Sequence, residues 1–268
     1  SEQIRQMLID NGFSEVITSS FRNKDKVQLK NALASDKSCL RSGLTKNIAE
    51  ALDKNAGFAD LLGSVDTRIF EIGTVFYPGD GRVDEHVALA LGVRIKQSGY
   101  SGKEDKVIDG VLQELNNKLG FNLPIPVHAN KTGTTKDGAV FEYEKGVYEI
   151  NLTRMLDELP HPTEYEAVEV GQEIVYQPFS VYQHMSRDIA MWVKEGTDPS
   201  EVVAVLNKYA GDLRVRTTQF DEFTKDGKTS LGFRLVFQSP NRTLTDGEVN
   251  TIMEQLYTIA SQSGWEVR

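Results

Sequence analysis

The sequence predicts an α+β fold arranged in two domains. The chain has 268 residues, and its hydrophobic (39%) and charged (26%) fractions are typical of a folded globular protein. Strand-like segments and amphipathic helical segments are mixed along the chain, and the C-terminal third follows the order β-α-β-β-α-β. We expect one domain over residues 1–172 and a second over 177–268, with the Pro- and Glu-rich stretch 153–176 as the candidate linker.

The first domain is predicted to begin with a capped helix. Ser1 can act as the N-cap, Ile4, Met7 and Leu8 form an apolar stripe, and Gly12 stands where a helix C-terminus belongs. Periodicity and turn residues then predict the remaining elements in chain order: strand 15–21, helix 45–54, strands 68–77 and 85–95, helix 103–119, and a strand pair within 139–152.

The second domain carries the clearest local signals. Thr245 and Glu248 form a capping box, and Asp226-Gly227 is typical of a tight hairpin turn. The expected elements are strand 186–193, helix 199–210, strands 213–223 and 230–238, a helix that starts at the capping box and stops at Gly264, and a short strand 265–268. This order is the ferredoxin-like arrangement, in which two helices cover one face of the sheet and leave the other open.

Strand alternation predicts which side chains occupy the open face. In the second strand Asp221 and Phe223 are expected on it, whereas Phe220 takes the core side. The other open-face residues are Asp188, Ala190, Trp192, Ser230, Gly232, Arg234, Val236 and Gln238, and the core set is Ile189, Met191, Val193, Leu231, Phe233, Leu235 and Phe237. Aromatic and polar groups on one sheet face suit single-stranded RNA. From the pattern alone an unspecified protein contact is favoured over RNA, and a small ligand also fits.

Charge and composition exclude several classes of protein. The formal net charge of −9 gives the chain no general electrostatic attraction for nucleic acid. No apolar run approaches the roughly 20 residues that span a bilayer, so no membrane partner is expected. The single cysteine, Cys39, excludes an internal disulfide and fits a reducing cytoplasm. Because the chain opens with Ser1, we expect a processed or truncated piece of a longer protein.

No catalytic motif is visible in the sequence. Phosphate-binding loops, dinucleotide fingerprints, zinc-protease motifs and nucleophile elbows are all missing, and the four histidines lack metal-ligand spacing. Carboxylate pairs such as Asp221 and Glu222 are neighbours on a strand, so they point to opposite faces and cannot converge on one bond. We therefore expect no catalytic residue, no metal site and no cofactor within this chain.

Several strings carry a family resemblance. Segments 186–190 (SRDIA), 219–221 (QFD), 230–238 (SLGFRLVFQ) and 241–250 (NRTLTDGEVN) resemble the ferredoxin-fold anticodon-binding domain of the bacterial phenylalanyl-tRNA synthetase beta chain. Segments 4–8, 12–18, 40–44 (LRSGL) and 70–76 (FEIGTVF) are similar to the catalytic-like domain of that beta chain. Over 96–172 the resemblance weakens, and the family's His-Pro-Gly-Arg-Ser/Ala segment is not recognisable.

The resemblance implies a non-catalytic part of a larger enzyme. The catalytic-like domain would have the antiparallel architecture of class II synthetases but no working active site. The sequence agrees with this, because it lacks the family's catalytic Arg-x-Glu motif and its Gly-rich, Arg-containing third motif. The beta chain pairs with a catalytic alpha chain in an α2β2 tetramer that uses ATP and magnesium to attach phenylalanine to tRNA(Phe). Residues 1–11 and 15–21 would face the alpha chain, or simply pack in the core. The alternatives are a free-standing RNA- or protein-binding module built from the same domains and, disfavoured by the missing motifs, a single-chain synthetase.

The resemblance also implies a set of RNA-binding residues on the open face. Ala190 would leave room for a base, Phe223 would stack on one, and Asp221 and Ser230 would hydrogen-bond to base edges or sugar. Arginines at three further positions are phosphate candidates by the same resemblance: Arg187, Arg234 and Arg242. Arg242 fits equally well as a residue that holds the turn and the capping box together.

Overall fold

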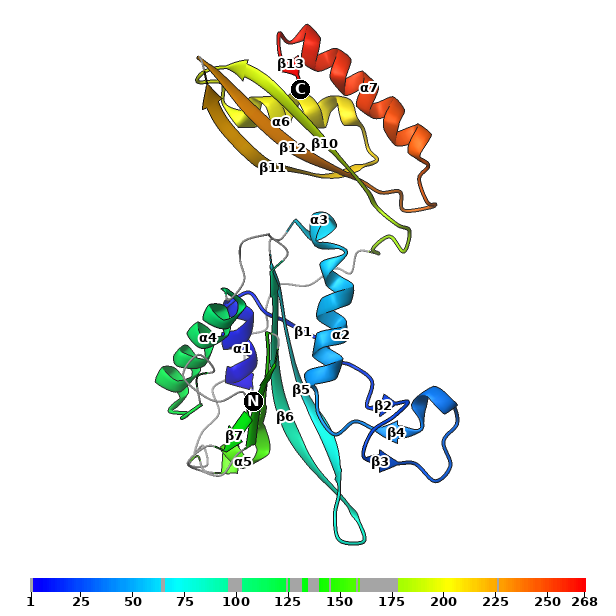
Figure 1. Ribbon diagram of the computed structural model, residues 1–268, viewed down its shortest axis with the longest axis vertical. Coiled ribbons are helices and arrows are strands. Elements are labelled where there is room, and N and C mark those ends of the chain that lie inside the picture. The colour runs from blue at the N-terminus through cyan, green and yellow to red at the C-terminus, as the bar shows by residue number, and fades with distance from the viewer. Residues whose placement is uncertain are drawn as a thin grey trace. The chain divides into compact units, whose positions relative to one another are not determined.

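The computed structural model describes residues 2–63, 66–95, 103–123, 125, 132–134, 140–144, 146–157, 159, 178–225 and 227–268. The chain forms two compact units, which are shown together in Figure 1. Unit 1 comprises residues 1–59 and 64–167, and unit 2 comprises 60–63 and 168–268. The predicted boundary at 172–177 and the predicted N-cap Ser1 lie outside the described residues.

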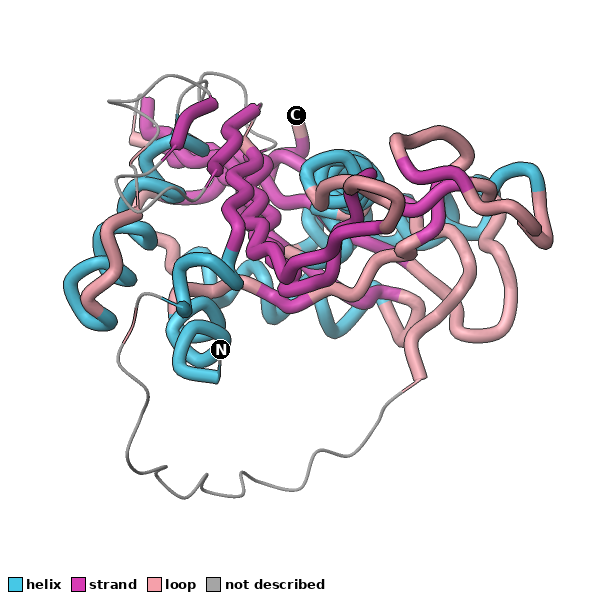
Figure 2. Tube along the Cα trace, turned by 90° about the horizontal axis from the view of Figure 1, so that it is seen from below, coloured by secondary structure: helices cyan, strands magenta, loops and turns pink. Residues whose placement is uncertain are grey.

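Unit 1 is built on a six-stranded sheet in which β1 is parallel to β5 and the other pairings are antiparallel. Its strands run side by side and are magenta in Figure 2. The longest ladder joins β5 and β6 without interruption from Asp66 opposite Ile95 to Pro78 opposite Val83, which confirms the two predicted long strands. The order across the sheet is β1 (Ser14–Glu15), β5 (Asp66–Pro78), β6 (Val83–Ile95), β9 (Val147–Asn151), β8 (Val140–Glu144) and β7 (Thr132–Thr134).

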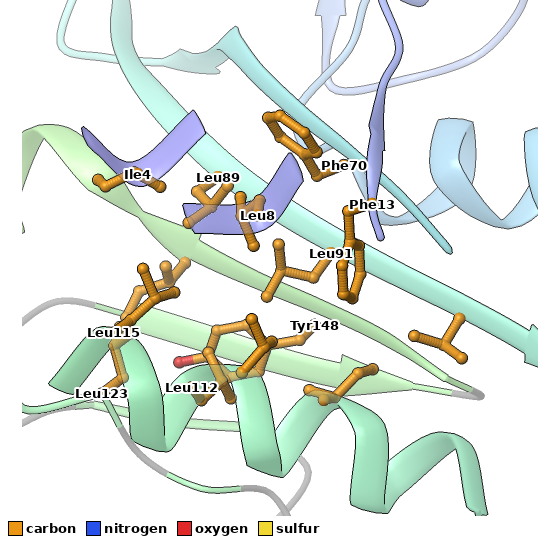
Figure 3. Close-up of a cluster of buried hydrophobic side chains, with 14 of the residues drawn as sticks. Ile4, Leu8, Phe13, Phe70, Leu89, Leu91, Leu112, Leu115, Leu123 and Tyr148 are labelled. Atoms are coloured by element: carbon orange, nitrogen blue, oxygen red, sulfur yellow. The ribbon is translucent and has the colours of Figure 1, made fainter. Parts of the chain in front are cut away.

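One face of this sheet is covered by α1 (Glu2–Asp10), α4 (Lys103–Leu119) and α5 (Leu152–Asp157). Apolar residues at helical spacing on α1 and α4 meet every second residue of the strands, so the two periodicities produce one core. Figure 3 shows Leu8 of α1 and Leu112 of α4 in the same cluster as Tyr148 of β9. The predicted linker is wrong at its start, because residues 152–157 form α5 and bury Leu152 in this core.

The opposite face is covered by α2 (Thr45–Ala56). This helix approaches β6 closely because the strand presents only small residues to it, namely Ala88, Ala90 and Gly92. A Cβ atom on Gly92 would overlap the Ile48 side chain and lie 2.9 Å from Leu52 Cδ1. Helix α2 can therefore lie this close to β6 only because the residue at position 92 has no side chain.

The predicted strand 15–21 is wrong in its middle. Strand β1 ends at Glu15 and β2 (Phe21–Arg22) belongs to a separate small sheet with β4 (Cys39–Leu40) and β3 (Val27–Gln28), next to a 3-10 turn at Ser35–Lys37. Between them the chain turns to a buried carboxylate: the Thr18 N–H donates to Glu71 Oε1 (3.2 Å) and its hydroxyl to Oε2 (2.6 Å). These bonds replace the ladder that a continuous strand would form.

Unit 2 has the predicted ferredoxin-like order, and its sheet runs β11-β12-β10-β13. Helices α6 (Pro199–Ala210) and α7 (Asp246–Gln262) pack on one face through Val202, Leu206, Val249 and Leu256. The predicted capping box is present at the start of α7, and every predicted core residue of the strands is buried except Phe220. The strands are β10 (Met185–Lys194), β11 (Arg214–Lys225), β12 (Lys228–Phe237) and β13 (Glu266–Val267). A four-residue helix, α3, spans Ala59–Leu62.

The direction of the Phe220 side chain differs from the prediction. The register of β11 against β12 shifts between Gln219, opposite Phe233, and Asp221, opposite Gly232, so Phe220 is an extra residue in a β-bulge. A Cβ atom on Gly232 would lie 3.0 Å from Phe220 Cζ. Phe220 therefore lies over Gly232 on the open face, and the expectation that it joins the core is wrong.

Candidate nucleic-acid interface

The open face of the unit 2 sheet brings together the residues that the resemblance singled out. Residues directly opposite each other on neighbouring strands share a face. The ladder pairs Ala190 with Gly232, Trp192 with Ser230, Asp221 with Gly232 and Phe223 with Ser230. Ala190, Asp221, Phe223 and Ser230 thus lie on one patch, opposite to the face that α6 and α7 cover.

Three aromatic rings line this patch. Trp192 and Phe223 form an edge-to-face pair with centroids 5.1 Å apart and planes at 77°. Phe220 stands beside them because of the bulge, with the Arg234 guanidinium 5.6 Å from its ring centroid. Phe220 is 52% exposed and Phe223 is 39% exposed. Exposed rings on a sheet are the platforms on which single-stranded nucleic acids stack their bases.

Arg268 occupies the centre of the same patch. Its backbone N–H donates to the Ala190 carbonyl (2.8 Å), which extends the β13–β10 pairing by one residue. Its guanidinium carbon lies 5.5 Å from the Trp192 centroid and 5.4 Å from that of Phe223, and its Nη1 donates to Ser230 Oγ (2.9 Å). Ser230 is 0% exposed. The predicted RNA-contacting hydroxyl is therefore buried and already bonded.

The three arginines predicted to contact phosphate are each paired with a carboxylate. Arg187 lies opposite Leu235, on the helix-covered side, and its Nη2 donates to Asp246 Oδ1 (2.5 Å). Arg234 lies on the open face and binds Asp188 through two bonds of 2.7 Å, which raise the pKa of Arg234. The third pair joins Arg242 to Glu248 of the capping box.

The Arg242–Glu248 pair supports the alternative role of Arg242, which is to hold the turn and the capping box together. Glu248 also accepts hydrogen bonds from the Thr245 backbone N–H (2.9 Å) and hydroxyl (2.8 Å). The bonds from Arg242, followed by those from Thr245, lower the pKa of Glu248 to about 2. Arg242 thereby holds the loop before α7 against the first turn of that helix.

Unit 1 contains a buried polar network around Arg41 and Glu71. Arg41 and Glu71 form an ion pair (2.7 Å) whose side chains are only 4% and 2% exposed. The Arg41 Nε donates to the Thr74 carbonyl (2.9 Å), and Asn47 donates to Thr18 Oγ1 (2.9 Å). A Cβ on Gly73 would overlap the Arg41 guanidinium, so the glycine of the FEIG string provides the space for it.

A cavity of about 250 Å³ in unit 1 lies beside the start of α2. Its lining mixes cations such as Lys26 and Lys46 with the carboxylates Glu142 and Glu149. Burial, reinforced by the Glu149 charge across the strand pair, raises the pKa of Glu142. In the described part of the chain, no three His, Cys, Asp or Glu side chains are placed to hold a metal ion.

The fold and the open face define a ferredoxin-like domain with exposed aromatic rings on its sheet, attached to an α+β sheet domain. Residues 180–268 match the family described as the ferredoxin-fold anticodon binding domain, and residues 1–142 match the phenylalanyl tRNA synthetase beta chain CLM domain. The chain belongs to the phenylalanyl-tRNA synthetase beta chain family. This confirms the resemblance and the predicted fold class.

Related proteins cover the chain almost completely. It is 26% identical to the phenylalanine–tRNA ligase beta subunit of Thermotoga maritima over 95% of its length and to that of Syntrophus aciditrophicus over 100%. The beta subunit of Listeria innocua is 25% identical over 94% of the chain. The chain spans 36 to 38% of the length of these relatives. None of the helices that the structure describes is long and apolar enough to cross a membrane.

Proposed function

We propose that the chain is the C-terminal portion of the non-catalytic beta subunit of a phenylalanine–tRNA ligase. In this role it supports assembly with the alpha subunit and binds the anticodon region of tRNA(Phe). The observation that carries the proposal is the gathering of Trp192, Phe220 and Phe223 on the open face of a domain that matches an anticodon-binding family. An anticodon loop offers unpaired bases, and such rings stack on unpaired bases.

Each open-face residue has a physical role in this proposal. Phe223 stacks on an anticodon base, and the small side chain of Ala190 leaves space for that base. Asp221 is exposed and accepts a hydrogen bond from a base edge or a sugar hydroxyl. Arg234 reaches phosphate only by sharing its guanidinium with Asp188 and Asp60. The net charge of −9 makes tRNA binding by this chain alone weak, so the rest of the enzyme adds affinity.

The N-terminal segment of unit 1 supports the assembly role. Ile17 is 94% exposed, and Ile9 and Phe21 are also exposed. In the proposed assembly these exposed apolar side chains contact the partner chain. The partner in this proposal is the alpha chain of an α2β2 tetramer in the cytoplasm. ATP and magnesium are used by the whole enzyme at its alpha chain, and no residue of this chain takes part in the chemistry.

Two measurements test the proposal. Co-expression with the matching alpha chain and size-exclusion chromatography with mass detection should yield a stable complex. Fluorescence anisotropy of labelled tRNA(Phe) with the full chain should show binding that Phe223→Ala weakens by about 5- to 150-fold, the loss of one stacked base. Tyr209→Ala is the matched control, because the exposed fraction of Tyr209 (43%) is similar to that of Phe223 (39%) but Tyr209 lies on α6. Separate elution together with absent tRNA binding overturns the proposal, whereas separate elution with retained binding favours a free-standing RNA-binding module.

A further inference from the structure

The cavity beside the start of α2 has a polar lining and a moderate size. Its volume of about 250 Å³ is below the roughly 300–1,000 Å³ of pockets that hold drug-sized molecules. Among the described residues that line it, the only aromatic ring is that of Tyr77, and no Val, Leu, Ile or Met side chain is present. The cavity therefore suits a small ligand that is mostly polar.

Two carboxylates lie next to each other on the sheet side of this cavity. Glu142 of β8 is directly opposite Glu149 of β9, so their side chains share the face that α2 covers. Like charges in opposite positions on a sheet repel each other. Glu142 forms no hydrogen bond or ion pair with the residues that the structure describes. A positively charged group between the two carboxylates would relieve this repulsion.

Glu149 has one carboxylate oxygen in use and one available to a ligand. Its Oε2 accepts the hydrogen bonds from Leu44 and Thr45 at the start of α2. Its Oε1 accepts none from the described part of the chain, although the residue is only 8% exposed. Gly43 adds no side chain over this carboxylate, and a Cβ there would lie 3.3 Å from Oε1. A nearly buried carboxylate oxygen on a cavity wall is a strong acceptor for an ammonium group.

Two lysines supply the opposite charge in the same cavity. Lys26 lies over the ring of Tyr77, with its Nζ 5.3 Å from the ring centroid, and Lys46 lies in the first turn of α2. Both attract the charge of Glu142, but neither forms an ion pair with any residue that the structure describes. The cavity thus keeps positive and negative groups apart, an arrangement that complements a ligand with one anionic and one cationic end.

We propose that this cavity binds a small, polar free amino acid. The ammonium group of the ligand lies between Glu142 and Glu149 Oε1. Its carboxylate lies at Lys26 and Lys46, so both ends form charge-assisted contacts. The lysines repel a metal ion or a polyamine, and the two carboxylates repel a free anion such as phosphate. Only the Tyr77 ring is available to an apolar side chain, so glycine or serine fits better than phenylalanine.

The first test is isothermal titration calorimetry of the full chain with glycine, L-serine, L-asparagine and L-glutamine. At least one of them should bind saturably at concentrations up to about 10 mM. Its amide and its N-acetyl derivative each lack one charge and should bind at least about tenfold more weakly. The proposal is overturned if none of the four binds, if L-phenylalanine binds more tightly than all of them, or if either derivative binds like its parent.

The second test changes the charged residues of the cavity. Glu142→Gln and Lys46→Gln should each weaken binding of the same amino acid by at least about tenfold. Glu85→Gln on β6 and Lys54→Gln in the last turn of α2 remove the same charges from exposed positions outside the cavity, and both variants should bind like the wild type. Wild-type affinity in Glu142→Gln and Lys46→Gln overturns the site.

The location of the ligand can be checked by urea unfolding. A ligand that binds only the folded state of unit 1 raises the unfolding midpoint of that unit. The shift should appear in circular dichroism and not in tryptophan fluorescence, because both tryptophans belong to unit 2. A shift of the fluorescence transition alone would place the ligand in unit 2 and overturn the proposal. Because every residue of this site belongs to unit 1, the inference does not depend on tRNA binding by unit 2.

Discussion

Replacement of Glu71 by glutamine should destabilise unit 1 selectively. Glu71 is buried and accepts hydrogen bonds from Arg41 Nη1 (2.7 Å), the Thr18 N–H (3.2 Å) and the Thr18 hydroxyl (2.6 Å). Glu71→Gln keeps the shape of the side chain but removes its charge. Arg41 is then left as a buried cation without a counter-charge, since its other acceptors, on Thr18 and Thr74, are neutral oxygens.

The expected loss follows from the burial of the pair. Removing one partner of a buried ion pair costs about 3–5 kcal/mol, because the remaining charge has lost its solvation and its partner. The amide oxygen of the substituted side chain still accepts one hydrogen bond, so we expect a value near the lower limit, about 3 kcal/mol. The double variant Arg41→Met/Glu71→Leu removes both charges and should recover at least about 1 kcal/mol of this loss.

The assay is urea unfolding followed by two probes. The chain has two tryptophans, Trp192 and Trp265, and both belong to unit 2, whereas far-UV circular dichroism reports both units. Glu71→Gln should shift the circular dichroism transition and leave the fluorescence transition in place, which makes unit 2 an internal control. A loss below about 1 kcal/mol, or a double variant that is less stable than Glu71→Gln, would refute the reasoning about the buried charge.

Three further predictions use the same unfolding assay. Gly92→Ala should lower the stability of unit 1 by about 1–3 kcal/mol, because the added methyl overlaps α2; an unchanged circular dichroism midpoint would contradict this. Thr245→Ala should cost unit 2 about 1 kcal/mol through loss of the α7 cap, and Thr245→Ser should restore it; equal fluorescence midpoints for both variants would argue against the cap. Burial lowers the pKa of His86 in the folded chain, so below about pH 6.5 the unfolded state takes up the proton first and the free energy of unfolding falls. His86→Gln should therefore lose less stability than the wild type between about pH 7.5 and pH 5.5, and identical losses would remove the histidine as the cause.

Elements with local signals were predictable from the sequence. Helices α4 and α6 begin and end at the predicted residues because their apolar periodicity and boundary signals are encoded within a few positions: a glycine follows each helix, and α6 also has Pro199 in its first turn. The capping box of α7 is also present as predicted, and the long strands β5 and β6 occur where they were predicted, although each begins two residues earlier. In each of these elements the local preference and the tertiary packing agree.

The errors have long-range causes. The strand predicted over 15–21 is interrupted because the backbone N–H and hydroxyl of Thr18 donate hydrogen bonds to Glu71, 53 positions away. Phe220 lies on the open face because Gly232, on the neighbouring strand, has no side chain to exclude it. Around Thr18 and around Phe220 the alternation of residues is the same as in a regular strand. No local sequence pattern therefore marks the interruption at Thr18 or the bulge at Phe220.

The candidate site was partly predictable for the same reason. Alternation within β10, β11 and β12 groups Ala190, Asp221, Phe223 and Ser230 correctly on one face. Alternation does not reveal that Arg268, 38 positions beyond Ser230, covers that hydroxyl. The ion pairs of the predicted phosphate-binding arginines were also hidden, because two of their partners, Asp188 and Asp246, become neighbours only in the folded domain.

Helix α2 receives its N-terminal cap from a distant part of the chain. Its own N-cap residue, Leu44, has no side-chain acceptor, and Glu149 of β9 accepts hydrogen bonds from the Leu44 N–H (2.9 Å), the Thr45 N–H (2.7 Å) and the Thr45 hydroxyl (2.6 Å). At ribosomal rates of about 5–20 residues per second, the residues of α2 leave the ribosome roughly 5–20 seconds before this carboxylate does. During that interval the first turn of α2 is capped by water alone. The helix can settle permanently on β6 only once β9 has joined the sheet, so a nascent chain stalled before residue 149 should leave α2 open to proteases.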